Sequence, residues 1–386
     1  MDKYQLDALI ASSTANLKYI CNYWGIGHQY IPGVEVYAVL PNRPGAKPTL
    51  ILPVSDMELA VDLLPYVDEF VPYGRFIYYA TPGKELCERD KWIKKSAIDS
   101  MPIPTALEAV TSVLRKLGLN DKRIGLDESK LSPKLYLKFV NNIPAAEVVD
   151  AYEIFREIRM VKTPEEIEIM EQAVRITEAA LKKSLALVVD GASEKDCQDV
   201  FEKTIFENGG VPLFTGIYFG EQSCYFGQAL PSSGKRLTAN SLIRCDVGCI
   251  YKRYFSDIAR TFFWGQPTDK HKQCYQAIWE AQEAALNITK PGTKVSELFN
   301  VAIEVAKRRI PKYERTHVGH GIGLELYEPP IITPTTDIIL EVGMVFNIEP
   351  PYYELGLGGF QVEDTVVVTD KGFRLLTTLD RDLGIL

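Results

Sequence analysis

Two aspartates lie within neighbouring apolar runs of the chain, where charged side chains are uncommon. Asp246 lies within the run 242–249, and Asp257 lies within a second run after a turn expected around 251–253. If the runs pair as a simple hairpin, positions 246 and 257 face each other, and opposed residues hold their Cβ atoms about 4.5–5.5 Å apart. Two carboxylates that close repel unless one is protonated or a cation lies between them. The pair predicts a cation site, although either aspartate alone would also suit a solvent-facing position.

Three further residues could complete such a site. His320 stands in Gly319-His320-Gly-Ile-Gly323, where small neighbours leave the imidazole unobstructed. Glu349 ends the apolar run Met344–Ile348, and Glu363 lies inside another. Acids suit such positions only when they are paired or metal-bound, and a salt bridge at each is the plainer alternative. Together with the aspartates, these residues predict a metal site with four oxygen ligands and one nitrogen.

The elements that must position these residues divide the chain into two domains. Up to residue 150, short apolar runs alternate with amphipathic stretches, a pattern typical of an α/β domain. Lys162-Thr-Pro-Glu-Glu166 then combines an N-cap, a proline at the first helical position and a capping box, which predicts a helix start. We expect the boundary near 155–163, with domains of 1–158 and 159–386.

The second domain mixes helices and strands in an order typical of α+β. The expected elements are helices from Ser193, Thr268 and Ser296, and strands over 242–249, 256–263, 344–348 and 360–369.

Composition excludes several classes of protein. The 386 residues are 46% apolar and carry a formal net charge of −8, so the chain lacks the basic surplus typical of nucleic-acid binding. No apolar run approaches the ~20 residues of a membrane span, and the N-terminus lacks the layout of a signal peptide, which predicts a cytoplasmic protein without a membrane partner. Seven cysteines without a Cys-x-x-Cys indicate reduced thiols. We expect Cys245 and Cys249 to be buried strand thiols and not zinc ligands.

Four motifs occur in one order along the second domain. After the two-aspartate hairpin come Gly-His-Gly-Ile-Gly-Leu-Glu at 319–325, Ile-Glu-Pro at 348–350 and Val-Glu-Asp-Thr at 362–365. In these motifs the chain resembles the pita-bread metallopeptidases, which include Xaa-Pro dipeptidase and aminopeptidase P, with creatinase as a relative that lost the metals. The N-terminal segment 6–25 is similar to that of the prolidase and creatinase branch. The resemblance implies an α+β fold, with a C-terminal pita-bread domain preceded by a smaller creatinase-like α/β domain.

The resemblance further implies an enzyme with two divalent metal ions. Asp246 would bind one metal, His320 and Glu349 the other, and Asp257 and Glu363 both. A metal-activated hydroxide would attack the carbonyl of a peptide or small amide, with Glu349 as the proton acceptor. Oxygen-rich ligation favours manganese, with iron, cobalt or zinc as alternatives. The resemblance also implies a homodimer in which the N-terminal domain of one chain closes the pocket of the other.

The residues around this metal cage depart from the family. Tyr327 and Thr316 stand where histidines are usual, His317 lies one place off, Gln361 replaces a common arginine, and Gln228 is nearest to another missing histidine. Tyrosine, with a reference pKa near 10, cannot match histidine as a proton shuttle at neutral pH. Tyr327 and His317 are still the candidates for proton transfer. Substrate contacts are expected from His28, Gln228 and Gln361.

These departures predict a specialised substrate, either an atypical dipeptide or a small amide. An ordinary prolidase with neutral drift, a metal-dependent lyase of a small molecule and a catalytically silent binding protein stay open as alternatives. Arg260 is expected to order the carboxylates without contacting substrate.

Overall fold

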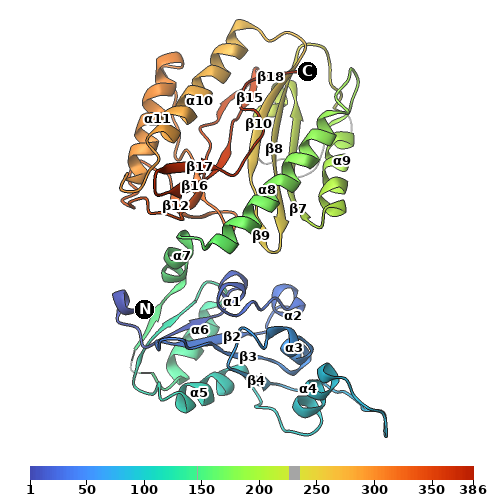
Figure 1. Cartoon of the computed structure of the whole chain (residues 1–386), viewed down its shortest axis with the longest axis vertical. Coiled ribbons are helices and arrows are strands. Elements are labelled where there is room, and N and C mark those ends of the chain that lie inside the picture. Colours follow the sequence, from blue (N-terminus) through green and yellow to red (C-terminus); the bar gives the residue numbers. More distant parts are fainter. Residues whose placement is uncertain (146, 226–234) are drawn as a thin grey trace. The chain divides into compact units, whose positions relative to one another are not determined.

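The computed structural model describes residues 1–145, 147–225 and 235–386 and divides the chain into two compact units. Unit 1 is Met1–Phe155 and unit 2 is Arg156–Leu386 (Figure 1). Compactness alone defines these units, and the domain boundary placed after residue 158 stays a prediction. In the described part of the chain, none of the helices combines the length and the apolar character that crossing a membrane requires.

A six-stranded mixed sheet forms the middle of unit 1. Its strands are β1 (Ala8–Ala11), β2 (Tyr37–Pro41), β3 (Thr49–Pro53), β4 (Glu69–Tyr73), β5 (Arg123–Leu126) and β6 (Glu147–Asp150). The helices are α1 (Thr14–Cys21), α2 (Ile26–Tyr30), α3 (Ala60–Leu63), α4 (Glu88–Ala97), α5 (Ala106–Lys116) and α6 (Pro133–Asn142), and α7 (Tyr152–Met160) contains the boundary between the units.

Both faces of this sheet are buried, which explains its continuous apolar strands. The strand order is β4-β3-β2-β1-β5-β6, with β1 antiparallel to β2 and parallel to β5. Along β1, Leu9 and Ala11 join one apolar cluster, whereas Ala8 and Ile10 join another that includes residues of α5 and α6. A strand covered on both sides reads as an unbroken apolar run. The expected α/β organisation of this part of the chain is confirmed.

The described residues of unit 2 form two larger sheets and four long helices. Its strands are β7 (Val211–Phe219), β8 (Ser241–Tyr251), β9 (Tyr254–Phe255), β10 (Ile258–Trp264), β11 (His320–Gly321), β12 (Glu328–Ile331), β13 (Val345–Ile348), β14 (Tyr352–Glu354), β15 (Gly358–Phe360), β16 (Asp364–Thr369), β17 (Gly372–Leu375) and β18 (Gly384–Ile385). The helices are α8 (Pro164–Leu185), α9 (Glu194–Glu207), α10 (Asp269–Asn287) and α11 (Val295–Arg309).

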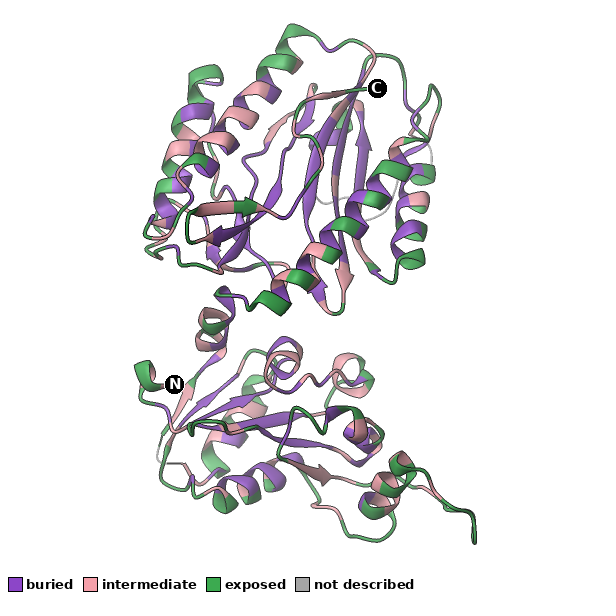
Figure 2. Ribbon diagram, in the orientation of Figure 1, coloured by how far each residue is buried: buried purple, intermediate pink, exposed green. Residues whose placement is uncertain are grey.

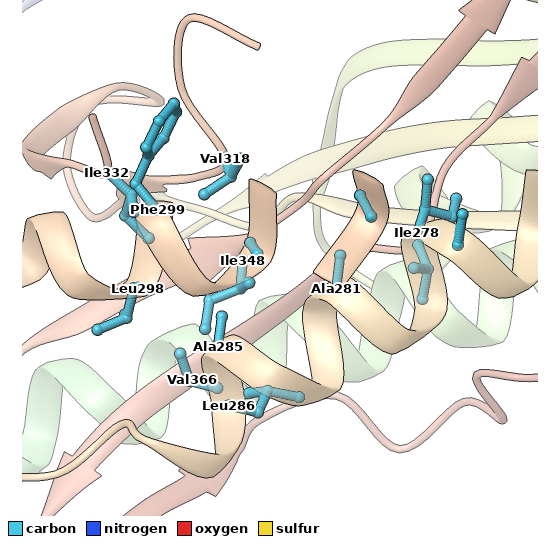
Figure 3. Packing of buried hydrophobic residues seen from close by; sticks show 14 of the residues in the cluster. Ile278, Ala281, Ala285, Leu286, Leu298, Phe299, Val318, Ile332, Ile348 and Val366 are labelled. Carbon is cyan, nitrogen blue, oxygen red and sulfur yellow. The ribbon is translucent and has the colours of Figure 1, made fainter. Parts of the chain in front are cut away.

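Each large sheet of unit 2 packs against its own pair of helices. The sheet β18-β10-β8-β7, with β9 beside β8, shares an apolar cluster with α8 and α9. The sheet β12-β11-β13-β16-β17 packs against α10 and α11, where Ala281 and Leu298 of the helices lie near Ile348 and Val366 of the strands (Figure 3). Strands are mostly buried, and the helices turn their exposed sides outward (Figure 2). A bridge between Ala259 and Glu363 joins the two sheets.

Most expected elements of unit 2 form, and two need correction. Ser193 and Thr268 are the N-caps of α9 and α10, whereas α11 begins at Val295, one residue before the expected Ser296. The Val295 amide donates to the carbonyl of Ile338, so tertiary pairing and not a serine cap fixes this start. The strand expected over 360–369 is interrupted at 361–363, because the Glu363 amide leaves its own sheet to donate to the carbonyl of Ala259.

The start of α8 shows the expected capping box. The Thr163 hydroxyl accepts from the Glu166 amide, and the Glu166 carboxylate accepts from the Thr163 amide. We predict that Thr163→Ala costs about 1 kcal/mol and lowers the melting temperature by about 2–4 °C, as expected for a domain of this size. Scanning calorimetry checks this, with Thr163→Ser as the matched control. An unchanged melting temperature in the alanine variant would contradict the proposed role of the cap.

Candidate metal centre

One cavity in unit 2 collects the acidic side chains that the sequence singles out. Its volume is about 410 Å³, and it is lined by residues of β7 and β8 and by residues next to the ends of β10, β12, β13 and β16. The acids in its wall are Asp246 on β8, Asp257 between β9 and β10, Glu349 directly after β13, and Glu363 directly before β16. His320 of β11 lies beside three of them. The structure therefore brings together the five residues expected to form a metal site.

The two aspartates do not face each other as the simple hairpin predicted. Asp246 pairs with Ala259, because the turn consists of two residues, Lys252 and Arg253, with left-handed φ values of 47° and 78°. A two-residue turn of this kind suits the twist of a hairpin. The expected register is shifted by two positions, and an even shift keeps side chains on the same face. Asp246 and Asp257 are therefore diagonal neighbours that line one cavity.

The Nε2 atom of His320, which carries no hydrogen, faces the carboxylates. Its Nδ1 atom lies 3.0 Å from the Gly321 carbonyl, which can only accept, so Nδ1 carries the proton. The Nε2 atom lies 3.6 Å from Asp257 Oδ2, 3.5 Å from Glu349 Oε1 and 4.0 Å from Glu363 Oε1. A lone pair surrounded by three carboxylates is stabilised when a cation lies between them.

Burial and mutual repulsion shift the pKa values of these groups. Burial, followed by the charges of neighbouring acids, holds the pKa of Asp257 and that of Glu363 well above their usual values. Burial also raises the pKa of Asp246, and it lowers the pKa of His320. Each shift disfavours the charged form of a group that has been removed from water by burial.

Several polar atoms of this site have no protein partner. Within the described residues, Asp257 Oδ1, His320 Nε2 and Glu349 Oε1 are buried without a hydrogen bond. Buried polar atoms are normally satisfied, and these three are all typical metal donors. One donor atom each from Asp257, His320 and Glu363 lie within 4.8 Å of one another. The residues present therefore fit divalent metal ions.

A second set of polar residues holds the carboxylates in place. Asn347 Nδ2 donates to Glu363 Oε1 at 2.9 Å, and Gln361 Nε2 lies 3.3 Å from Glu349 Oε2. Arg244 Nη1 donates to Asp246 Oδ2 at 3.0 Å.

Sequence reasoning missed Asn347 and Arg244, yet a signal for both is present. Each stands two residues before an acid, in Arg244-Cys-Asp246 and Asn347-Ile-Glu349. Positions i and i+2 of a strand share a face.

Tyr327 and His317 lie at the same site. The Tyr327 ring stacks on His320 with centroids 3.6 Å apart, and burial and the charge of Glu349 raise the pKa of its hydroxyl. His317 Nε2 lies 3.7 Å from Glu349 Oε1. The loop that carries Tyr327 is held by buried Glu328, whose carboxylate accepts from Lys162 Nζ at 3.0 Å.

The other residues considered from sequence lie elsewhere. His28 belongs to α2 of unit 1, where its Nδ1 lies 3.3 Å from the Val34 carbonyl and burial lowers its pKa. Gln228 lies outside the described residues. Arg260 donates to the backbone oxygen of Glu363 and to Asp364 Oδ1, at 2.6 Å in both cases. It therefore orders the chain around Glu363.

The two cysteines near Asp246 are both buried in the sheet. Cys245 and Cys249 are fully enclosed in the apolar cluster beneath α8 and α9, and burial raises the pKa of each thiol. This agrees with the expected buried thiols.

Two family models match the chain. "Metallopeptidase family M24" matches residues 168–370, and "Creatinase/Prolidase N-terminal domain" matches residues 1–161. The fold and the site are those of a metallopeptidase. The chain belongs to metallopeptidase family M24 and carries a creatinase/prolidase N-terminal domain, which confirms the resemblance and the fold class. It is therefore an enzyme, a metal-dependent hydrolase of peptide bonds.

Similar proteins include several Xaa-Pro dipeptidases. That of Pyrococcus furiosus is 34% identical over 270 residues, which are 68% of this chain and 76% of the relative. That of Lactobacillus helveticus is 31% identical over 72% of this chain and 77% of its own length. The solved prolidase from Pyrococcus furiosus has a TM-score of 0.76 at 27% identity and 99% coverage of both chains. An Xaa-Pro dipeptidase from Bacillus anthracis, at 24% identity, shares the fold with a TM-score of 0.80 over 100% of this chain and 96% of its own.

Proposed function

We propose that the cavity of unit 2 binds two divalent metal ions. Asp246 binds one ion, His320 and Glu349 bind the other, and Asp257 and Glu363 bind both. The observation that carries this proposal is the convergence of Asp257, His320 and Glu363 donor atoms within 4.8 Å, beside buried atoms without partners. Four oxygen donors to one nitrogen favour manganese, with iron, cobalt or zinc as alternatives.

The residues of the site have distinct proposed roles in peptide hydrolysis. When bound, the two ions would lower the pKa of water and stabilise negative charge that develops on the substrate carbonyl. Glu349 accepts the proton, because its Oε2 atom is held by Gln361 while its Oε1 atom is buried without a hydrogen bond and lies 3.7 Å from His317 Nε2. His317 receives that proton from Glu349 and passes it to the departing nitrogen of the substrate. Tyr327, whose raised pKa keeps its hydroxyl protonated at neutral pH, donates a hydrogen bond and does not act as a base.

We propose a small peptide or small amide of specialised structure as the substrate. A cavity of about 410 Å³ is of the size that holds small ligands. Gln361 lies in its wall, and His28 and Gln228 stay predicted substrate contacts. The cytoplasmic location likewise stays a prediction.

Dipeptides of the Xaa-Pro type are predicted to be poor substrates. Their departing imino nitrogen needs a proton, and Tyr327 supplies one less readily than histidine at neutral pH. Their carboxylate needs a free cation, but Arg244, the only Lys or Arg lining the cavity in the described chain, donates to protein groups from Nε, Nη1 and Nη2. We expect kcat/KM for Gly-Pro below about 10⁴ M⁻¹s⁻¹.

Steady-state hydrolysis of Gly-Pro beside non-proline dipeptides tests this prediction. Tyr327→His should raise Gly-Pro turnover, and Tyr327→Phe, which keeps the ring and removes the hydroxyl, is the matched control. If the natural protein exceeds about 10⁴ M⁻¹s⁻¹ on Gly-Pro, an ordinary prolidase replaces the specialised enzyme.

The test of the whole proposal joins metal analysis to a substrate screen. We expect close to two divalent ions per chain in protein purified without chelator. A screen of dipeptides and small amides by mass spectrometry should then show products that together have gained one water. Products without added water would indicate a lyase, and metal-loaded protein that turns over none of these compounds would indicate a binding protein.

We further propose a homodimer in which α2 and its flanking residues contact the second chain. Apolar side chains here are unusually exposed, with Ile26 and Tyr30 each 75% and Ile31 56% accessible. Exposed apolar patches of this kind mark interaction sites. Sedimentation at micromolar concentration should give twice the monomer mass, and Ile26→Asp with Tyr30→Asp should lower it. A fully active monomer would contradict the dimer.

A further inference from the structure

A buried arginine on strand β8 contacts an acidic side chain of the proposed metal centre. Arg244 is 1% exposed. Its Nη1 atom donates to Asp246 Oδ2 at 3.0 Å and to Gln361 Oε1 at 2.9 Å. Its Nε atom donates to the Ser223 carbonyl at 2.6 Å, and Nη2 to the Tyr225 carbonyl at 2.9 Å. The guanidinium is therefore fixed in one orientation by four acceptors.

Two tyrosine rings hold the same guanidinium from its sides. The central carbon of the Arg244 group lies 5.0 Å from the Tyr218 ring centroid and 5.3 Å from that of Tyr353. Contacts of a cation with aromatic rings strengthen when the cation is removed from water, and a planar arginine stacks on rings better than lysine does. We therefore expect lysine at position 244 to make these contacts less well than arginine, although both side chains are positively charged.

Gln361 links Arg244 to the carboxylates of Glu349 and Glu363. Because the Gln361 Oε1 atom accepts from Arg244, its Nε2 atom points the other way, 3.3 Å from Glu349 Oε2 and 3.4 Å from Glu363 Oε2. The reverse orientation of the amide would place two donors together and two acceptors together. Arg244, together with the Tyr353 hydroxyl that donates to the same Oε1 atom at 3.3 Å, therefore fixes the orientation of Gln361, and through it the position of two carboxylates.

We propose that Arg244 is a positioning residue of the metal centre, and that the ion bound by Asp246 depends on it most. This inference rests on the proposed two-metal site. Arg244 touches Asp246 directly, but it reaches Glu349 and Glu363 only through Gln361. Losing the arginine removes the charged donor that holds the Asp246 carboxylate, while His320 keeps its own contacts with the remaining acids.

Two effects of removing Arg244 oppose each other, and the geometry decides between them. Removing a positive charge would by itself strengthen the attraction of a cation to Asp246. Removing a hydrogen bond that orients a ligand typically weakens metal affinity by about 10–100-fold. Because Arg244 donates two bonds to the site from one Nη1 atom, we expect loss of orientation to prevail. The affinity of one of the two ions should fall by about that factor.

The experiment compares metal binding by full-length natural protein, Arg244→Met and Arg244→Lys. Each is dialysed against manganese buffers of increasing free concentration, and bound metal is measured by mass spectrometry. We expect two ions of similar affinity in the natural protein and, in both variants, one ion retained and one weakened about 10–100-fold. Arg309→Met removes a cation paired with Glu280 at the surface and should leave both affinities unchanged.

The outcomes separate this inference from the proposal on which it rests. Natural protein that binds no manganese would overturn the metal centre itself. Natural protein with two ions, together with Arg244→Met and Arg244→Lys binding both ions as tightly or more tightly, would overturn only the role of Arg244. Melting of each variant without metal shows whether it is folded. If Arg244→Met does not fold, Arg244→Lys decides, because it keeps the buried charge and loses the fixed fork of donors.

A second comparison tests the route through Gln361. Gln361→Leu removes the link to Glu349 and Glu363 but leaves the contact of Arg244 with Asp246. If the arginine acts through Gln361, the double variant Arg244→Met with Gln361→Leu weakens metal binding less than the sum of the single changes, because residues that act as a unit are not additive. Full additivity would overturn this part of the inference.

Discussion

Replacing Asp257 by asparagine is expected to remove much of the bound metal and to lower kcat/KM by at least about 10³-fold. In the proposed centre this carboxylate is shared by both ions, and an amide offers only one neutral oxygen in its place. Stabilisation of transition-state charge by a metal is worth several kcal/mol, and each ~1.4 kcal/mol is a factor of ten in rate. Metal content and initial rates on the best substrate of the screen check the prediction together.

A matched change on the surface controls for the loss of a negative charge. Asp199 pairs with Lys195 on α9, away from the cavity, so Asp199→Asn should keep full metal content and activity. Full metal content and activity in Asp257→Asn would refute the assignment of the centre. Loss of activity with both ions retained would instead show that Asp257 acts on the substrate and does not hold metal.

The acidic residues of the site were predictable because apolar strands make a charged residue conspicuous. Asp246 and Glu363 each interrupt a run whose neighbours are buried, and an acid there needs a partner of opposite charge or hydrogen-bond donors. His320 was recognisable for another reason: glycine at 319 adopts a φ of 152° and at 321 packs against the Pro329 backbone, where a Cβ would come within 2.2 Å. The motif therefore reflects close packing of the chain around the imidazole.

The polar residues that orient the acids could have been found by the same argument carried one step further. Arg244, Asn347 and Gln361 all stand two positions before an acid of the site, and residues two apart on a strand share a face. Of these three residues, only Gln361 was predicted to lie at the site, and that prediction came from the resemblance to the family and not from this spacing. Which acid each one touches depends on pairing between distant strands, which the sequence does not express locally.

The hairpin shows where local reasoning reaches its limit. Register depends on which two residues form the turn, and Lys252 and Arg253 adopt left-handed conformations that non-glycine residues seldom favour. The residue types of Lys252 and Arg253 do not predict left-handed conformations. Pairing along the length of β8 and β10 imposes these conformations. The apolar pattern still placed both acids on one face, because it constrains the parity of the register more strongly than the register itself.

The same crowding of acids leads to a second large effect, on stability. Burial holds the pKa of Asp257 and Glu363 well above their values in an unfolded chain, so without metal the folded state binds more protons than the unfolded state. Stability of the metal-free protein must then fall as pH rises from the unfolded pKa values near 4 towards the raised folded values. Divalent ions stabilise the ionised carboxylates and remove this penalty. Metal-free protein should therefore become less stable with rising pH, while metal-loaded protein should not.

Calorimetry of metal-free and metal-loaded protein across pH 5–8 measures the effect. Free metal at about 1,000 times its Kd adds about 4 kcal/mol, or about 8–16 °C in melting temperature for a domain of this size, and the gap should widen as pH rises. The lowered pKa of His320 acts in the opposite sense, because an imidazole buried in its neutral form makes stability rise with pH up to about 6.5.

The control is the double variant Asp257→Asn with Glu363→Gln, which retains all four histidines. The difference between the pH profiles of the two metal-free proteins isolates the contribution of the two carboxylates. A metal-free protein whose melting temperature rises with pH as steeply as that double variant would show that these carboxylates carry no such penalty, and that their convergence does not require a cation.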